Sequence, residues 1–145
     1  MATLDDAITI GRREGFLAVV STVRADATIQ SSVVNAGVLT HPVTGERVVG
    51  IVTYGRAKLA NLRARPQITI TFRSGGQWAS VEGRAELAGP DDPYPGLDAE
   101  RLRLLLREIF QGAGGTHDDW AAYDQVMAEQ RRTAVLVTPA RVYSN

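Results

Sequence analysis

The stretch 47–73 constrains the fold most, because it changes its hydrophobic period twice. Residues 48–52 form an apolar, mostly β-branched run, which predicts a strand. Residues 56–65 then take a helical period with leucines on one face. Pro66 ends this helix, because the residue before a proline is disfavoured in the α region. Alternation of isoleucine and threonine follows over 67–72, so the stretch is predicted to be strand, helix, strand.

The rest of the chain is read by the same patterns. Further strands are expected at 16–23, 28–40, 77–87 and 133–138, and further helices at 4–13, 97–111 and 117–130, while 139–145 forms a tail with room for one more strand. Turn residues at 41–46 and 74–76 indicate hairpins. Six strands joined mostly by hairpins predict one mainly β domain over residues 1–145, an antiparallel barrel with flanking helices of the α+β class.

Two of the expected strands have unusual faces. Residues 16–23 are so apolar that burial on both faces, or nearly so, is expected. In 28–40, by contrast, neither face is cleanly apolar, because each mixes polar and apolar side chains: Thr28, Gln30, Ser32 and Val34 on one face, and Ile29, Ser31, Val33 and Asn35 on the other. A strand that lines a pocket has this composition.

Charge is unevenly placed along the chain. Sixteen basic and sixteen acidic residues cancel, yet 47–81 carries six basic residues and no acidic one. Arg56 and Lys58, the latter the single lysine of the sequence, stand at the start of the predicted helix, where free backbone N–H groups favour an anion. Asn61 shares a helix face with Lys58. These residues predict a phosphate site, and solvated surface charge is the alternative.

Composition excludes several classes of function. A net charge of zero argues against nucleic-acid binding, and the lack of cysteine excludes disulfides and thiolate chemistry. No segment resembles a leader or a membrane span, so a cytoplasmic protein is expected. His41 lies in a turn and His117 at a helix start, where local structure explains them better than metal binding or catalysis does. We therefore predict no metal and no catalytic side chain.

The two tryptophans could serve the core or a cofactor platform. Core packing is the ordinary role of aromatic side chains. Trp78 is the better functional candidate, because it follows the Gly75-Gly76 turn at a strand start. A protein with an anion site, a polar-lined strand and no reactive side chain has the features of an enzyme whose cofactor carries the reaction.

Several motifs resemble those of the split-barrel flavin and deazaflavin oxidoreductases, the pyridoxamine-phosphate-oxidase-like family. The motifs are Gln30-x-Ser32, Gly55-Arg56-Ala57-Lys58-Leu59-Ala60-Asn61-Leu62 with Arg65-Pro66, Trp78-Ala79-x-Val81-Glu82-Gly83, and His117-x-Asp119-Trp120-x-x-Tyr123 with Arg131-Arg132. They are most similar to the mycobacterial-type branch that uses the deazaflavin coenzyme F420. The resemblance covers nearly the whole chain.

This resemblance implies a homodimer of split β-barrels of the FMN-binding type, with cofactor sites at the subunit interface. It implies that Arg56, Lys58 and Asn61 bind the cofactor phosphate, that Gln30, Ser32 and Thr53 line the cofactor, and that Trp78 and Ala79 approach it from one subunit. The activity implied is hydride transfer from reduced F420 to an activated double bond of a small or medium hydrophobic substrate, with no nucleic acid or membrane as partner.

The chain departs from true pyridoxamine phosphate oxidases, because its end, 138–145, lacks their Arg-Leu-type substrate clamp. Vitamin B6 oxidation is therefore not expected. FMN remains the alternative cofactor, since it carries a phosphate in the same place. F420 is favoured because its acidic tail suits arginines such as Arg63, Arg65 and Arg73. A non-catalytic protein that binds a cofactor or a tetrapyrrole remains the alternative function.

Overall fold

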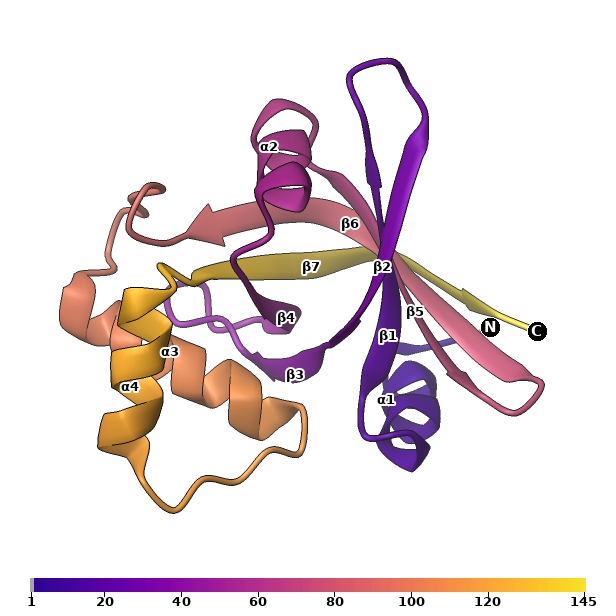
Figure 1. Cartoon of the computed structure of the whole chain (residues 1–145). Helices are drawn as coiled ribbons and strands as arrows, with labels where there is room; N and C mark the ends of the chain where they lie inside the picture. The colour runs from indigo at the N-terminus through magenta and orange to yellow at the C-terminus, as the bar shows by residue number, and fades with distance from the viewer. Residues whose placement is uncertain (1) are drawn as a thin grey trace.

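The computed structural model describes residues 2–145, and in this part of the chain strands dominate (Figure 1). The strands are β1 (Leu17–Val23), β2 (Ile29–Asn35), β3 (Gly37–Thr40), β4 (Arg47–Thr53), β5 (Gln67–Ser74), β6 (Gln77–Ala88) and β7 (Thr133–Ser144). The helices are α1 (Leu4–Arg13), α2 (Arg56–Ala64), α3 (Ala99–Gly112) and α4 (Trp120–Glu129). All strand pairs are antiparallel, in the order β2-β1-β5-β6-β7-β4-β3. The predicted antiparallel barrel with flanking helices is confirmed.

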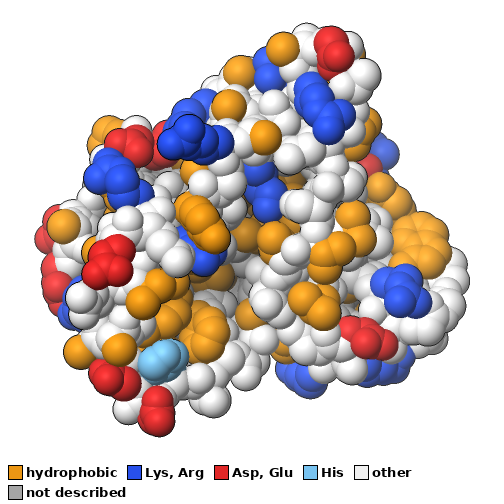
Figure 2. Space-filling view, in the orientation of Figure 1, with side chains coloured by type: hydrophobic (Ala, Val, Ile, Leu, Met, Phe, Trp, Pro, Cys, Tyr) orange, Lys and Arg blue, Asp and Glu red, His pale blue; other side chains and the backbone are white. Residues whose placement is uncertain are grey.

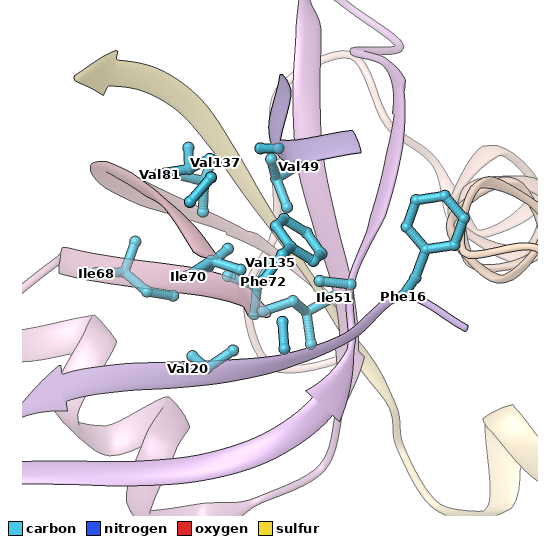
Figure 3. Packing of buried hydrophobic residues seen from close by; sticks show 14 of the residues in the cluster. Phe16, Val20, Val49, Ile51, Ile68, Ile70, Phe72, Val81, Val135 and Val137 are labelled. Atoms are coloured by element: carbon cyan, nitrogen blue, oxygen red, sulfur yellow. The ribbon is translucent and has the colours of Figure 1, made fainter. Parts of the chain in front are cut away.

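The barrel interior is filled by β-branched and aromatic side chains that point toward one another from five strands (Figure 3). Ile51, Ile70 and Phe72 are fully buried there. Helix α1 packs beside this core, and its Gly11 lets the backbone approach Phe72 so closely that a Cβ would lie 2.7 Å from the ring. A capping box between Thr3 and Asp6 begins α1 where the sequence predicts it.

A second apolar cluster joins β4 and β7 to α3 and α4. Strand β4 therefore has one face in the barrel, with Val49 and Ile51, and the other against α3. Close contact of α3 with β3 depends on two glycines. A Cβ on Gly37 would lie 2.6 Å from the Ile109 carbonyl, and one on Gly112 would lie 2.6 Å from the Val38 carbonyl. These contacts hold α3 and α4 to one side of the barrel, at the left of Figure 1.

The structure has seven strands where the sequence predicts six. The predicted strand 28–40 is divided at Ala36 into β2 and β3, which lie at opposite ends of the sheet order. Ala36 donates its N–H to the Phe16 carbonyl at 2.9 Å, outside the strand ladders, and Gly37 then meets α3. The prediction of one continuous strand was wrong because this break is set by packing rather than by a local turn signal.

The C-terminal tail belongs to β7, which runs through Pro139 to Ser144 as one strand. Its register against β6 shifts between Glu82 and Gly83, so Gly83 faces Pro139 while Glu82 faces Arg141. A bulge of this kind accommodates a proline within a sheet. No separate strand therefore follows 133–138 in the described chain; the predicted sixth strand is longer instead.

Strand β1 is buried on one face rather than on nearly both. Ala18 and Val20 are buried, whereas Leu17 and Val19 are 49% and 41% exposed. On the neighbouring strand, Ile29 and Val33 are exposed on β2, and Val33 lies opposite Val19 in the register. Both faces of β1 are therefore apolar, as the sequence indicates, but within the single chain only one of them is covered.

Helices α3 and α4 begin slightly later than predicted. Asp98 caps α3 by accepting from the Arg101 N–H, and Asp119 caps α4 by accepting from the Ala122 N–H. Among the described residues, no helix combines the length and the apolar character needed to cross a membrane.

Candidate functional site

Helix α2 begins directly after β4 and leaves its first N–H groups available. Gly55 is its N-cap residue and offers no side chain to the helix start. Thr53 Oγ1 accepts the Gly55 N–H at 3.2 Å, which fixes the turn between strand and helix. The free N–H groups of this first turn form a partial positive charge suited to an anion.

Lys58 lies in this first turn and is almost buried, with 6% of its surface exposed. Its amino group forms no ion pair within residues 2–145, and burial lowers its pKa from the ordinary value of 10.5. An ammonium group removed from water without a counter-charge is costly. The site therefore has the electrostatic character of one that takes up an anion.

Asn61 lies one turn further along α2 and connects the helix to two strands. Its Nδ2 donates to Thr22 Oγ1 at 3.1 Å and to Gln30 Oε1 at 3.3 Å. Thr22 Oγ1 also donates to Gln30 Oε1 at 3.3 Å. The Gln30 oxygen is occupied in this way, so the hydrogen bonds that Gln30 can still offer to a ligand are those of its amide N–H groups.

Ser32 follows Gln30 on the same side of β2. Its Oγ is buried and has no hydrogen-bond partner in the described chain. A buried hydroxyl without a partner is uncommon, and a bound group that completes it is one explanation. Together with Lys58 and the free N–H groups of α2, Ser32 fits a phosphate-bearing cofactor along α2 and β2.

The other arginines of the basic stretch are placed differently. Arg56 is exposed at the helix start. Arg63 binds Asp92 through two hydrogen bonds of 2.8 and 2.6 Å, and Arg65 donates to the Val23 carbonyl at 2.8 Å. Arg73 donates to the carbonyl of Gly75, in the β5–β6 turn, which lies far from α2 in Figure 1. Of these three proposed rim arginines, Arg63 and Arg65 are already engaged and Arg73 belongs to another part of the chain.

An open cleft of about 610 Å³ lies between the barrel and the α3–α4 pair. Its lining comes from β2, β4, α3, α4 and the segments α1–β1, α3–α4 and α4–β7 that connect elements: Gly15, Val34, Asn35, Val52, Ile109, Phe110, Ala113, Gly114, Gly115, Tyr123, Met127 and Arg132. Figure 2 shows this face hollowed between two lobes, with hydrophobic side chains along the hollow and basic ones toward α2. Val34 lies two residues after Ser32 and so on the same face of β2, whereas Val52 and Thr53 are adjacent in β4 and point to opposite faces. Ser32 and Thr53 are not themselves part of the cleft lining.

Sequence reasoning missed most of this cleft. Ile109 and Phe110 fall in the predicted helix 97–111 without any assigned role, and Arg132 appeared only within a family motif. Tyr123 is held by a hydrogen bond of 2.9 Å from its OH to the Leu106 carbonyl, and burial raises its pKa to about 12. Phe110 contacts Tyr123 and Trp120 with ring-centroid distances of 5.2 and 6.1 Å. The mixture of aromatic residues in α3 and α4 was the one available signal.

Trp78 and Ala79 are not brought together with Lys58 in one chain. Trp78 lies beside the β5–β6 turn and packs edge-on against Tyr143, with ring centroids 6.0 Å apart. Figure 1 shows that turn on the opposite side of the molecule from α2. Ala79 is fully buried in the barrel core. Their assignment to the cofactor stays a prediction, and it requires a second subunit.

Both histidines have local partners. His41 Nδ1 accepts the N–H groups of Val43 and Thr44, each at 3.1 Å, so His41 stabilises the β3–β4 turn. His117 Nδ1 accepts the Asp119 N–H at 2.9 Å at the start of α4. Over residues 2–145, no three histidine or carboxylate side chains gather in a way that could hold a metal ion.

Sequence comparison identifies the fold family. The family model described as pyridoxamine 5′-phosphate oxidase matches residues 4–145. The chain belongs to this family. The split barrel is the family's fold, and the resemblance drawn from the sequence motifs is confirmed. No curated protein matches the sequence.

Three solved structures illustrate how widely this fold is shared. A conserved hypothetical protein from Mycobacterium tuberculosis is 17% identical, with a TM-score of 0.69 over 99% of this chain and 84% of that one. An F420 reductase is 19% identical, with a TM-score of 0.58 over 89% of this chain and 90% of that one. A pyridoxamine 5′-phosphate oxidase-related, FMN-binding protein from Nostoc punctiforme is 13% identical, with a TM-score of 0.63 over 99% and 86%. At these identities the likeness is one of fold.

Proposed function

We propose that this protein is an F420-dependent reductase that acts on small or medium hydrophobic substrates. The observation that carries the proposal is Lys58, an almost buried lysine without an ion-pair partner in the described chain, at a helix start that has no side-chain cap. A phosphate placed there would accept from the ammonium group and from the free N–H groups of α2. Motif resemblance and the F420 reductase of the same fold support the choice of cofactor.

The chain's own residues would bind and orient the cofactor rather than react. Arg56 and Lys58 neutralise the phosphate, while Gln30, held by Asn61, presents its amide N–H groups. The Ser32 hydroxyl gains a partner when a polar group of the cofactor reaches it. Positioning of this kind supplies the catalytic contribution, because it holds the reacting atoms at a productive distance.

Reduced F420, when bound, supplies a hydride, which carries two electrons, to an activated double bond, and water supplies the proton that completes the product. The apolar walls of the cleft from Val34, Val52 and Phe110 would hold the hydrophobic acceptor and exclude bulk water. Tyr123 does not serve as the proton donor in this scheme, because its OH donates to a backbone carbonyl and burial raises its pKa to about 12.

A homodimer with sites at the interface forms part of the proposal. The exposed apolar side chains of β1 and β2, among them Val19 and Val33, would be covered by a second copy. A partner would also let Trp78 approach a cofactor, since Trp78 stands at the start of β6, beside the β5–β6 turn that Figure 1 shows away from α2.

Titration of the purified protein with F420 and with FMN tests the cofactor assignment. We expect F420 to bind more tightly, and Lys58→Ala to weaken its binding by about 1.5–3 kcal/mol, the range for a hydrogen bond to a charged group. Equal affinity of wild type and Lys58→Ala would remove the phosphate site, and tighter binding of FMN would replace the cofactor.

Turnover is tested separately from binding. Protein and reduced F420 are mixed with a panel of enones and quinones, and reoxidation of the coenzyme is followed by absorbance. Reoxidation above the protein-free rate is expected for at least one acceptor. Stoichiometric binding with no turnover over the whole panel would favour a cofactor-binding protein over an enzyme.

A further inference from the structure

The apolar cleft contains one charged side chain. Of its lining residues within the described chain, only Arg132 carries a charge, and no carboxylate accompanies it. Arg132 directly precedes β7 and reaches β4, where its Nη1 lies 3.5 Å from the Val52 carbonyl. An arginine at the wall of an otherwise apolar cleft selects among ligands by charge, because a few polar groups in such a cleft set specificity.

The guanidinium of Arg132 is oriented by its neighbours without being neutralised. Its Cζ lies 4.0 Å from the centre of the Tyr54 ring, and its Nε donates to Gln130 Oε1 at 2.8 Å. Stacking and these bonds fix the plane of the group. A guanidinium has five N–H donors, so most of them stay available for a ligand.

Other arginines near the cleft, on α3 and just after α4, are paired with carboxylates. Arg103 and Arg107 both pair with Asp124, and Arg131, the neighbour of Arg132, pairs with Asp91 at 2.6 Å. Arg132 is half-buried, and burial lowers its pKa. A desolvated cation that lacks a carboxylate is costly, and an anionic ligand offsets that cost.

We propose that the cleft beside β2 and α3 is the substrate site and that Arg132 selects planar, largely apolar molecules carrying one carboxylate, as aromatic and unsaturated acids do. The inference rests on the proposed function, in that Lys58 and α2 take the cofactor phosphate and leave Arg132 to the second ligand. The aromatic part lies against Val52, Phe110 and Met127, and the carboxylate accepts from the guanidinium. Arg132 is a specificity-determining residue in this scheme.

The volume and the chemistry of the walls agree with such a ligand. A cleft of about 610 Å³ falls within the range that holds small organic molecules. Phe110 stands in an aromatic cluster with Trp120 and Tyr123, which gives the cleft a rigid wall for a flat ring. Since no acidic residue lines the described cleft, a carboxylate meets attraction from Arg132 without repulsion nearby.

The test compares two ligands of nearly equal shape, cinnamate and cinnamamide, which differ in charge. Binding of each is measured by calorimetry on the cofactor-free protein and again with F420 bound. Wild type is expected to bind cinnamate at least tenfold more tightly than cinnamamide. Arg132→Gln should weaken cinnamate binding at least tenfold and change cinnamamide binding less than threefold, while Arg132→Lys restores part of the difference.

Arg131→Gln is the matched control, because it removes a neighbouring, exposed charge that lies outside the cleft lining. It should leave the preference for cinnamate unchanged. Equal affinity of wild type for the two ligands would overturn the proposal, and so would an equal loss of both in Arg132→Gln. The wild-type comparison decides even where a variant fails to fold.

Failure of this proposal is distinguishable from failure of the proposed function. If Arg132→Gln weakens F420 binding as much as Lys58→Ala does, Arg132 belongs to the cofactor site and the substrate assignment is overturned. If wild type binds no F420 yet prefers cinnamate through Arg132, the proposed function is wrong, whereas the charge-selective cleft stands.

Discussion

The Nδ2 atom of Asn61, on α2, lies 3.3 Å from Oε1 of Gln30, on β2. The same amide group donates to Thr22 Oγ1 at 3.1 Å, and Asn61 is 8% exposed while Thr22 is 1% exposed. The Asn61 side chain therefore connects α2, the helix that carries Lys58, to strands β1 and β2. We therefore expect the position of the proposed anion site to depend on this contact.

Replacing Asn61 tests that dependence. Asn61→Ala leaves the buried Thr22 and Gln30 oxygens with fewer donors, so we expect the free energy of unfolding to fall by about 1–3 kcal/mol. Binding of F420 should weaken as well, because Gln30 loses the contact that orients it. Urea denaturation and cofactor titration measure the two effects. A variant as stable as wild type, with unchanged affinity, would show that the contact does not position the site.

Lys58 should make the cofactor-free protein less stable near neutral pH. Its pKa is lowered below 10.5 by burial, so folding carries the cost of burying a charged group. We expect Lys58→Met to raise the free energy of unfolding by about 0.5–2 kcal/mol at neutral pH, the usual gain from removing such a feature. The same variant should bind F420 less tightly, so the protein without Lys58 would be more stable but less able to bind its cofactor.

The pH dependence of that difference gives a sharper check. At pH values between the lowered pKa of Lys58 in the folded protein and 10.5, the unfolded chain binds more protons at this residue than the folded protein does. The free energy of unfolding of the wild type therefore rises with pH over this range. The advantage of Lys58→Met should therefore shrink as pH rises toward 10.5. Arg56→Met, which removes an exposed arginine that stays charged, should show a pH-independent difference. An advantage of Lys58→Met that grows with pH would contradict the assignment.

Tyr123 is expected to act as a wall of the cleft. Its OH donates to the Leu106 carbonyl at 2.9 Å and is buried. Tyr123→Phe removes this hydrogen bond, so stability should fall by about 0.5–1.5 kcal/mol, the net contribution of one hydrogen bond. Turnover with saturating substrate should stay within about twofold, since an acid-base group would contribute on the order of a hundredfold. A loss of that larger size at a pH where the variant remains folded would assign Tyr123 a chemical role.

The apolar face of β1 and β2 is expected to bury itself against a second copy. Val33 is 64% exposed and lies opposite Val19 in the strand register. Val33→Glu places a charge in the predicted interface, where an unpaired carboxylate is costly, and should yield monomers. Light scattering after size-exclusion chromatography gives the mass. Val43→Glu, at an exposed valine of the β3–β4 turn, is the control and should leave the mass of wild type unchanged.

Local patterns in the sequence were sufficient for most elements. Helix α1, the hairpin turns at 41–46 and 74–76, and the strand-helix-strand segment at 47–73 are all confirmed. Each depends on interactions between near neighbours, such as caps, turn residues and period. Predictions failed where distant contacts decide, as at Ala36, where the chain meets Phe16 and α3, and along β7, where a bulge against β6 accommodates Pro139.

The sequence by itself determined that a helix begins at Arg56 with two cations in its first turn, because a strand, a glycine break and a proline stop are local signals. Only the tertiary structure decided that Lys58 is buried, that Asn61 reaches Gln30, and that Arg132 completes a cleft with Val52. Burial and charge pairing arise only when elements pack together. Here α2 packs on β1, and α3 and α4 pack on β4, so residues that lie far apart in the chain come into contact.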